Sequence, residues 1–240
     1  MNAETLQWAS VDDSWKLINL AVQSGVSRLF LSGSPGVGKS HFGAYGFGNR
    51  PYYQITLSED LSVQEMFGHF VPKGQVFEWH DGPCTRAARE GAVLVINEIQ
   101  RASDAVKDAL LGLLDDPSVA MISLPNGENM RPKAGFTVVA TSNDPLSSLD
   151  PALQDRFEVA VALTAPNPGL VSKLNEALEG LGYAVANSFK DEGREIPPRR
   201  AFAFAKLVGQ GVDNKQAAVM AFGDRAPDVL NALIAGGVRV

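Results

Sequence analysis

The sequence predicts an α/β fold: a doubly wound, mainly parallel five-stranded sheet with a small all-helical domain at its C-terminal side. Two observations predict it. Up to residue 163, short apolar segments alternate with helix-like segments, which is typical of a parallel sheet with helical crossovers. Beyond that residue only helical periodicity is evident, and no strand candidate of comparable strength follows.

Five segments have the apolar character of strands. The third, AVLVI, is apolar at every position, as expected for a strand that is covered on both faces. Turn-forming and helical stretches separate them, so each is expected to be a separate strand. The five predicted strands are 28–31, 52–57, 92–96, 136–141 and 157–163.

Helical periodicity accounts for most of the remaining chain. A helix over 14–23 places Trp15, Ile18 and either Ala21 or Val22 on one face, and another is expected over 104–114. The loop TAPNPG follows the last strand and is rich in proline, asparagine and glycine. The helices expected after it are 168–182, 198–209, 214–222 and 226–235. We therefore predict two domains, 1–164 and 165–240.

The composition excludes several classes of protein. The chain has 240 residues, of which 45% are hydrophobic and 20% charged, as in ordinary globular proteins. Its net charge of −6 argues against a general affinity for nucleic acid. The one cysteine, Cys84, excludes an intramolecular disulfide and suits a reducing compartment. No apolar run approaches the roughly 18 residues that span a bilayer, and the first residues lack a signal peptide, so we expect a cytoplasmic protein without a membrane partner.

A phosphate-binding motif lies between the first strand and the next helix. The segment G-S-P-G-V-G-K-S matches G-x-x-x-x-G-K-[ST] in full, and its strand–helix setting separates it from a glycine-rich turn with an accidental lysine. Backbone amides of such a loop surround phosphate, the lysine supplies a positive charge and the serine hydroxyl is a magnesium ligand. The next residue is a histidine, for which an ordinary place in the first helical turn is the simpler interpretation. The candidate nucleotide-binding residues are Gly33, Ser34, Pro35, Gly36, Val37, Gly38, Lys39, Ser40 and His41.

The strand 92–96 ends in a candidate catalytic pair, Asn97-Glu98. Glu98 is suited to act as the general base that activates water, although an acid at a strand end can also be a simple cap. Asn97 has an oxygen for a metal or its bound water but brings no negative charge, whereas magnesium prefers anionic oxygens. Ser40, Asn97 and Glu98 are therefore the candidate metal residues, and the rate of hydrolysis is expected to be low.

These motifs together resemble a known family. The phosphate loop, AVLVINEIQRA, FTVVATSND and LDPALQDRF occur in the order found in AAA+ ATPases. The stretch FEWHDGPCTRAAREGAVLVINEIQRAS is similar to the MoxR branch, and the nearest subgroup is the NorQ/CbbQ type. This resemblance covers residues 15–205 and implies ATP and Mg²⁺ as ligands and a hexameric ring. It also implies a protein partner, such as a separate von Willebrand factor A domain protein.

The resemblance assigns roles to three further residues. Asn143 matches the polar sensor that orients the attacking water, and its alternative is a turn-forming asparagine. Arg156 matches the arginine that a ring subunit presents to its neighbour's ATP, and its alternative is a surface pair with Asp155. Arg199 matches the sensor arginine of the helical domain, although Arg200 beside it leaves the register open.

Two insertions distinguish the chain from a minimal domain of this family. The insertion 62–82 contains four aromatic residues, which either contact a partner or pack the insertion onto the sheet. The insertion 119–132 contains Asn126-Gly127, a strong hairpin signal, and its role is open between partner contact and structure.

Three functions fit the sequence. The leading interpretation is an ATP-hydrolysing ring that remodels or activates a partner enzyme. The second is a slow or inactive ATPase, in which nucleotide state switches assembly because Asn97 weakens hydrolysis. The third is a DNA-directed AAA+ protein, which the acidic balance disfavours.

Overall fold

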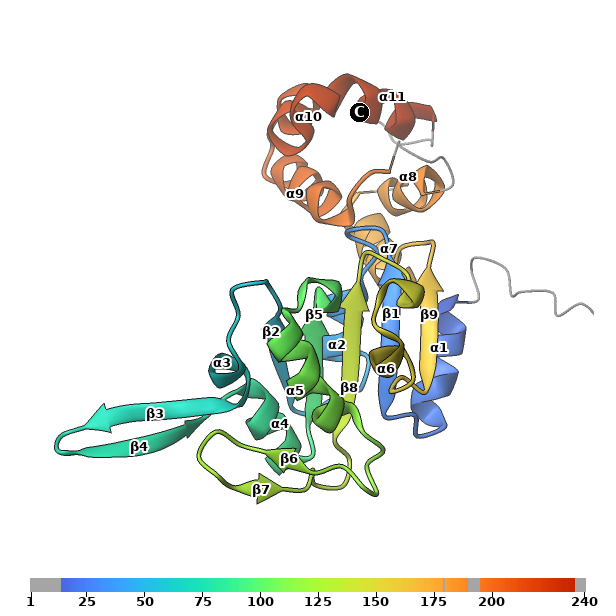
Figure 1. The fold of residues 1–240 in the computed structure, drawn as a ribbon. Coiled ribbons are helices and arrows are strands. Elements are labelled where there is room, and N and C mark those ends of the chain that lie inside the picture. The colour runs from blue at the N-terminus through green and yellow to red at the C-terminus, as the bar shows by residue number, and fades with distance from the viewer. Residues whose placement is uncertain (1–13, 179, 190–194, 236–240) are drawn as a thin grey trace, which may run out of the picture. The chain divides into compact units, whose positions relative to one another are not determined.

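The computed structural model describes residues 14–178, 180–189 and 195–235 (Figure 1). It divides into two compact units. One contains Lys16–Gly33 and Lys39–Ala162; the other contains Trp15, the loop tip Ser34–Gly38 and the described residues from Leu163 onward. The predicted domain boundary between residues 164 and 165 stays a prediction.

A five-stranded sheet forms the centre of the first unit, in the order β2-β5-β8-β1-β9. The pairings of β2 with β5, β5 with β8, and β1 with β8 are parallel, which confirms the predicted doubly wound α/β fold. Every residue of β5 and β8 is buried, as strands covered on both faces must be. The strands are β1 (Arg28–Gly33), β2 (Tyr52–Thr56), β5 (Val93–Asn97), β8 (Thr137–Ser142) and β9 (Val159–Leu163).

Helices cover both faces of the sheet because successive strand residues point to opposite sides. Leu94 and Ile96 of β5 join the large apolar cluster that includes Leu110 of α5. Val95 points the other way and lies against Gly43 of α2, where an added Cβ would come within 2.8 Å of a valine methyl. Figure 1 shows α5 and α2 on opposite faces. The helices of this part are α1 (Ser14–Gln23), α2 (Lys39–Tyr45), α3 (Val63–Phe67), α4 (Pro83–Glu90), α5 (Asp104–Leu114) and α6 (Pro151–Gln154), with 3-10 turns η2 (Ile99–Arg101) and η3 (Leu146–Ser148).

A buried arginine joins the sheet to α5. Arg28, at the first position of β1, is 1% exposed, and desolvation lowers its pKa. Its guanidinium donates to backbone carbonyl oxygens at the C-terminal end of α5 and just before β8. The acceptors are Leu113, Leu114, Asp115 and Phe136. These bonds satisfy carbonyls that a helix end leaves open, so they fix the position of Asp115.

Both insertions form antiparallel hairpins. The first has strands β3 (Gly68–Lys73) and β4 (Val76–Asp81), and it projects away from the sheet in Figure 1. The second has strands β6 (Ile122–Ser123) and β7 (Asn129–Met130), joined through the predicted Asn126-Gly127 turn. The side chain of Arg89 in α4 connects the two hairpins, because it pairs with Asp81 at 2.8 Å and with Glu128 at 2.6 Å.

The aromatic residues of the insertion 62–82 divide between two environments. Phe67 is buried, and Trp79 packs against the main apolar cluster, so these two hold the insertion on the domain. Phe70 and Phe77 are 52% and 72% exposed. Neither of the two sequence interpretations of this insertion therefore describes all of its aromatic residues.

From Leu163 onward, the described residues of the second unit form helices and the segments that connect them, apart from the end of β9. Its helices are α7 (Pro168–Ala177), α8 (Leu181–Ser188), α9 (Pro198–Gly209), α10 (Asn214–Phe222) and α11 (Ala226–Ala235), with the 3-10 turn η4 (Gly223–Arg225). Leu174, Val185, Phe204 and Phe222 lie in its separate apolar core. The prediction of a single helix over 168–182 is wrong. The chain leaves α7 at Leu178 and reverses through Gly180, whose φ of 77° suits a glycine.

Candidate nucleotide-binding site

The phosphate loop connects β1 to α2, as the motif predicts. Its three glycines have φ values of 142° at Gly33, 88° at Gly36 and 107° at Gly38, a range that residues with a Cβ rarely adopt. Pro198, at the start of α9, lies where it would meet a Cβ of Gly36 at 3.1 Å. The backbone amide of Asn167 donates to the carbonyl of Val37 at 2.9 Å. The loop tip is thus held by residues of its own unit.

Lys39 lies at the start of α2 and is 7% exposed. Its ammonium donates to the carbonyl of Gly33 at 2.5 Å and to the amide oxygen of Asn143 at 3.0 Å. Desolvation lowers the pKa of Lys39, while the negative charge of Glu98 acts against that shift. The lysine is therefore held at the mouth of the loop together with the predicted sensor and the predicted base.

The strand ends bring the predicted base and sensor together. Glu98 follows β5 and Asn143 follows β8, which are neighbouring parallel strands in the sheet. The amide nitrogen of Asn143 donates to the Oε2 oxygen of Glu98 at 3.2 Å. Gln100, which the sequence analysis did not single out, donates to the same oxygen at 2.8 Å. Two amides from two different elements therefore orient one carboxylate.

The three predicted metal residues lie close together, and their donor atoms suit magnesium only in part. The hydroxyl of Ser40 donates to Oδ1 of Asn97 at 2.6 Å, and the hydroxyl of Thr141 donates to the same oxygen at 3.1 Å. Of Ser40, Asn97 and Glu98, only Glu98 is a carboxylate. This set fits magnesium that arrives with the phosphates of a nucleotide, and it offers one negative charge fewer than an aspartate at position 97 would.

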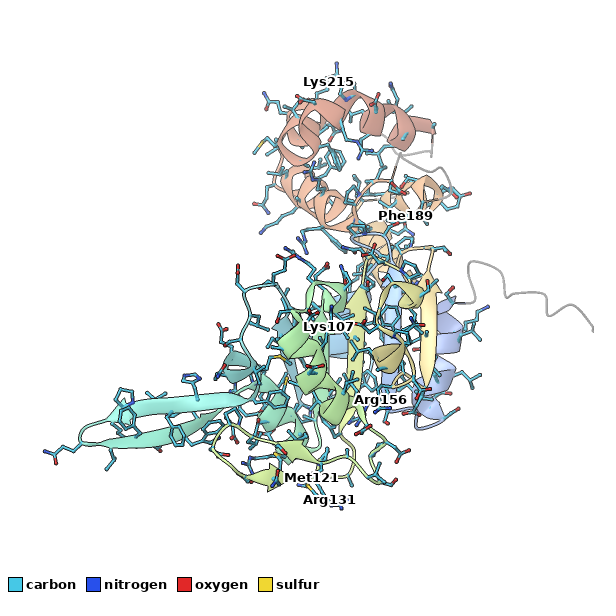
Figure 2. The ribbon with its side chains drawn as sticks, in the orientation of Figure 1. Lys107, Met121, Arg131, Arg156, Phe189 and Lys215 are labelled. Atoms are coloured by element: carbon cyan, nitrogen blue, oxygen red, sulfur yellow. The ribbon has the colours of Figure 1, made fainter. Side chains whose placement is uncertain are left out.

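Arg156 does not join this cluster. It lies between α6 and β9, near the start of β9 in Figure 2, and its guanidinium pairs with Asp115 at 2.8 Å and with Asp155 at 3.7 Å. The pair with Asp155 is the one expected if Arg156 is an ordinary surface arginine. The stronger contact is with Asp115, at the end of α5, which Arg28 holds through the backbone. A role on the chain's own nucleotide is not favoured by this position, whereas a role on a neighbouring subunit is compatible with it.

The remaining predicted residues are Arg199, with Arg200 beside it, and His41. Arg199 and Arg200 are both exposed in the first turn of α9, directly after the proline that abuts the loop tip. This position suits either arginine, so the register stays open. His41 is exposed in the first turn of α2, with its ring centroid 4.8 Å from that of Tyr45. This ring contact is typical of an ordinary residue on a helix.

The glycine loop, its buried lysine and the carboxylate that follows β5 define a P-loop nucleotide-binding protein. Residues 28–157 match the family model described as "AAA domain (dynein-related subfamily)". The chain belongs to this family, and within it to the AAA+ ATPases of the NorQ/CbbQ type in the MoxR branch. The predicted resemblance is therefore confirmed.

Known proteins agree with this assignment. The chain is 35% identical over 146 residues to the protein NorQ of Paracoccus denitrificans, covering 58% of this chain and 53% of NorQ. It is 27% identical over 219 residues to the denitrification regulatory protein NirQ of Pseudomonas aeruginosa, covering 83% of each. Among solved structures, a RuvB mutant of Thermotoga maritima has a TM-score of 0.57 at 17% identity, covering 94% of this chain and 72% of RuvB. That likeness concerns the fold alone.

None of the described helices has the length and apolar character that crossing a membrane requires. Within the same residues, no group of three or more His, Cys, Asp or Glu side chains is arranged to hold a metal ion by itself.

Proposed function

We propose that this chain hydrolyses ATP with Mg²⁺ as a hexameric ring and uses the cycle to activate or assemble a partner enzyme. The observation that carries the proposal is the convergence of Lys39, Asn143 and Glu98 at the ends of two neighbouring strands, beside the phosphate loop. An ammonium, an amide and a carboxylate in contact are the groups that phosphoryl transfer to water needs.

Each group has a distinct role in the proposed reaction. Lys39 binds the β- and γ-phosphates. Asn143 forms hydrogen bonds with both Lys39 and Glu98 and so fixes their relative position. Glu98 takes a proton from water, whose oxygen forms a bond to the γ-phosphorus while the bond from that phosphorus to the bridging oxygen breaks and ADP leaves. Magnesium, held through Ser40 and Asn97 with the phosphates, would neutralise charge on the β- and γ-oxygens.

The position of Arg156 supports the proposed ring. A guanidinium outside its own chain's cluster can complete the site of an adjacent subunit and stabilise charge on the transferred phosphoryl group. The partner enzyme follows by analogy with NirQ, whose name describes a denitrification regulatory protein. The exposed side chains of Phe70 and Phe77 are suited to contact that partner or a separate von Willebrand factor A domain protein.

The test is steady-state phosphate release with Mg²⁺-ATP across a protein concentration series. A site shared between subunits predicts that turnover per chain rises with concentration and reaches a plateau as the ring assembles. The mass of the species should be measured at the same concentrations by light scattering. Turnover per chain that stays constant while the mass changes would contradict a shared site.

A second function is supported by the surroundings of Asn97. Its Oδ1 oxygen already accepts two hydroxyl hydrogen bonds, and the residue brings no charge to magnesium. Such a site suits a nucleotide-dependent assembly switch with slow hydrolysis. RuvB shares the fold, and at 17% identity this gives no support to a DNA-directed function.

The Asn97→Asp variant distinguishes rapid hydrolysis from slow switching. An aspartate keeps the acceptor for Ser40 and Thr141 and adds a negative charge beside the magnesium position. We expect turnover to rise about tenfold, with half-saturation at a lower magnesium concentration. Phosphate release measured over a magnesium titration checks this. Equal or lower turnover at saturating magnesium would show that Asn97 does not limit the rate.

A further inference from the structure

We propose that Gln100 is a positioning residue for Glu98, which selects the carboxylate oxygen that receives the proton of the attacking water. This inference rests on the proposed hydrolytic function. Gln100 lies within the segment AVLVINEIQRA, but no role is assigned to it above. Its evidence is local geometry around one carboxylate.

The hydrogen bonds to Glu98 are unequal. Oε2 accepts from Nε2 of Gln100 at 2.8 Å and from Nδ2 of Asn143 at 3.2 Å. Among the described residues, Oε1 accepts only the longer bond of 3.4 Å from the same asparagine nitrogen. Because two amide donors converge on Oε2, Oε1 keeps its capacity to accept a proton. The geometry therefore assigns Oε1 as the basic oxygen.

Within the described residues, the side-chain amide of Gln100 forms a hydrogen bond with the Glu98 carboxylate and with no other group. Its Oε1 oxygen is buried and makes no hydrogen bond in that part of the chain. If the amide were flipped, its oxygen would face the negatively charged Oε2 of Glu98, which has no hydrogen to donate. Buried acceptors without partners are uncommon, and they concentrate where function imposes the arrangement. A side chain kept only for packing would be better replaced by an apolar one.

The backbone at Glu98 provides independent support. Its φ of 58° makes it the one non-glycine residue with a positive φ among the described residues. A left-handed conformation is unfavourable for a residue with a Cβ, and such strain is found mainly at functional sites. The chain turns there directly from β5 into η2, and this turn brings position 100 back to the side chain of position 98. The strained turn therefore places the Gln100 donor beside the Glu98 carboxylate.

Two variants of Gln100 test the proposal. Gln100→Met removes both polar atoms at similar length, and Gln100→Glu keeps the size while replacing the donor with a second carboxylate. We expect kcat to fall about tenfold in each, with KM for ATP and the affinity for a fluorescent ATP analogue unchanged. Gln216→Met, an exposed glutamine in α10, is the matched control and should keep the wild-type kcat.

The double variant separates positioning from general destabilisation. In a Glu98→Gln background there is no base to orient, so adding Gln100→Met should produce no further loss of kcat. A kcat of Gln100→Met equal to or above the wild-type value, or a parallel change in KM, would overturn the proposal. So would a further loss in the double variant. If Glu98→Gln itself keeps wild-type turnover, or the wild type shows none above it, the proposed mechanism of hydrolysis by Glu98 fails first and this role fails with it.

Discussion

The Glu98→Gln variant should lose ATP hydrolysis by a factor of about 10² to 10⁴ while it still binds ATP. Glutamine has nearly the shape of glutamate, so the loop and the contacts of its neighbours remain. It cannot accept a proton from water at neutral pH, and this is the function proposed for the carboxylate. Single-turnover phosphate release, with ATP affinity from a fluorescent analogue, measures the two effects separately.

Glu176→Gln is the control for this experiment. Glu176 is an exposed glutamate of α7, so the same chemical change there should leave turnover at the wild-type level. If Glu98→Gln keeps more than about a tenth of the wild-type rate, general-base catalysis by this carboxylate is too small to support the proposed mechanism. In that case the acid at the end of β5 would have the structural role of a strand-end cap.

The Arg156→Ala variant should lose about 10³-fold in turnover, the lower end of the effect that such arginines have in other phosphoryl-transfer enzymes. The physical reason is loss of a positive charge at the transferred phosphoryl group of the adjacent subunit. Nucleotide affinity should change little, because the loop and Lys39 are intact. Phosphate release at concentrations that saturate assembly is the measurement, and Arg225→Ala, an exposed arginine of the helical unit, is the control.

Mixing two inactive variants tests the shared site directly. An Arg156→Ala subunit still has Glu98, and a Glu98→Gln subunit still has Arg156. Where these meet in the right order, one interface holds both groups, so an equal mixture should recover a substantial fraction of wild-type turnover. No recovery, in mixtures shown to contain both chains in one assembly, would show that Arg156 acts within its own chain. The pair with Asp115 would then be its structural role.

The sequence by itself determined the class of fold and the centre of the site. Five apolar segments with intervening helices specify a parallel sheet, because its inner strands must be buried on both faces and each crossover must be long. The phosphate loop is also determined by the local sequence. Its three glycines, lysine and serine at fixed spacing form the loop wherever a strand precedes them and a helix follows them. The helices over 104–114 and 198–209 begin and end where the periodicity predicts.

The tertiary structure decided whatever depends on residues far apart in the chain or on the backbone of a single position. The sequence places Arg28 at the start of an apolar strand and does not predict its burial. The fold explains that burial, because the end of α5 supplies carbonyl oxygens that accept hydrogen bonds from the guanidinium. Phe67 and Phe77 are two phenylalanines of one insertion, but Phe67 ends α3 and is buried, whereas Phe77 lies on β4 and is exposed. Gln100 gains its role because the left-handed turn at Glu98 folds it back onto the carboxylate. Periodicity reports which face of an element is apolar; it contains no information on which distant groups will meet that face.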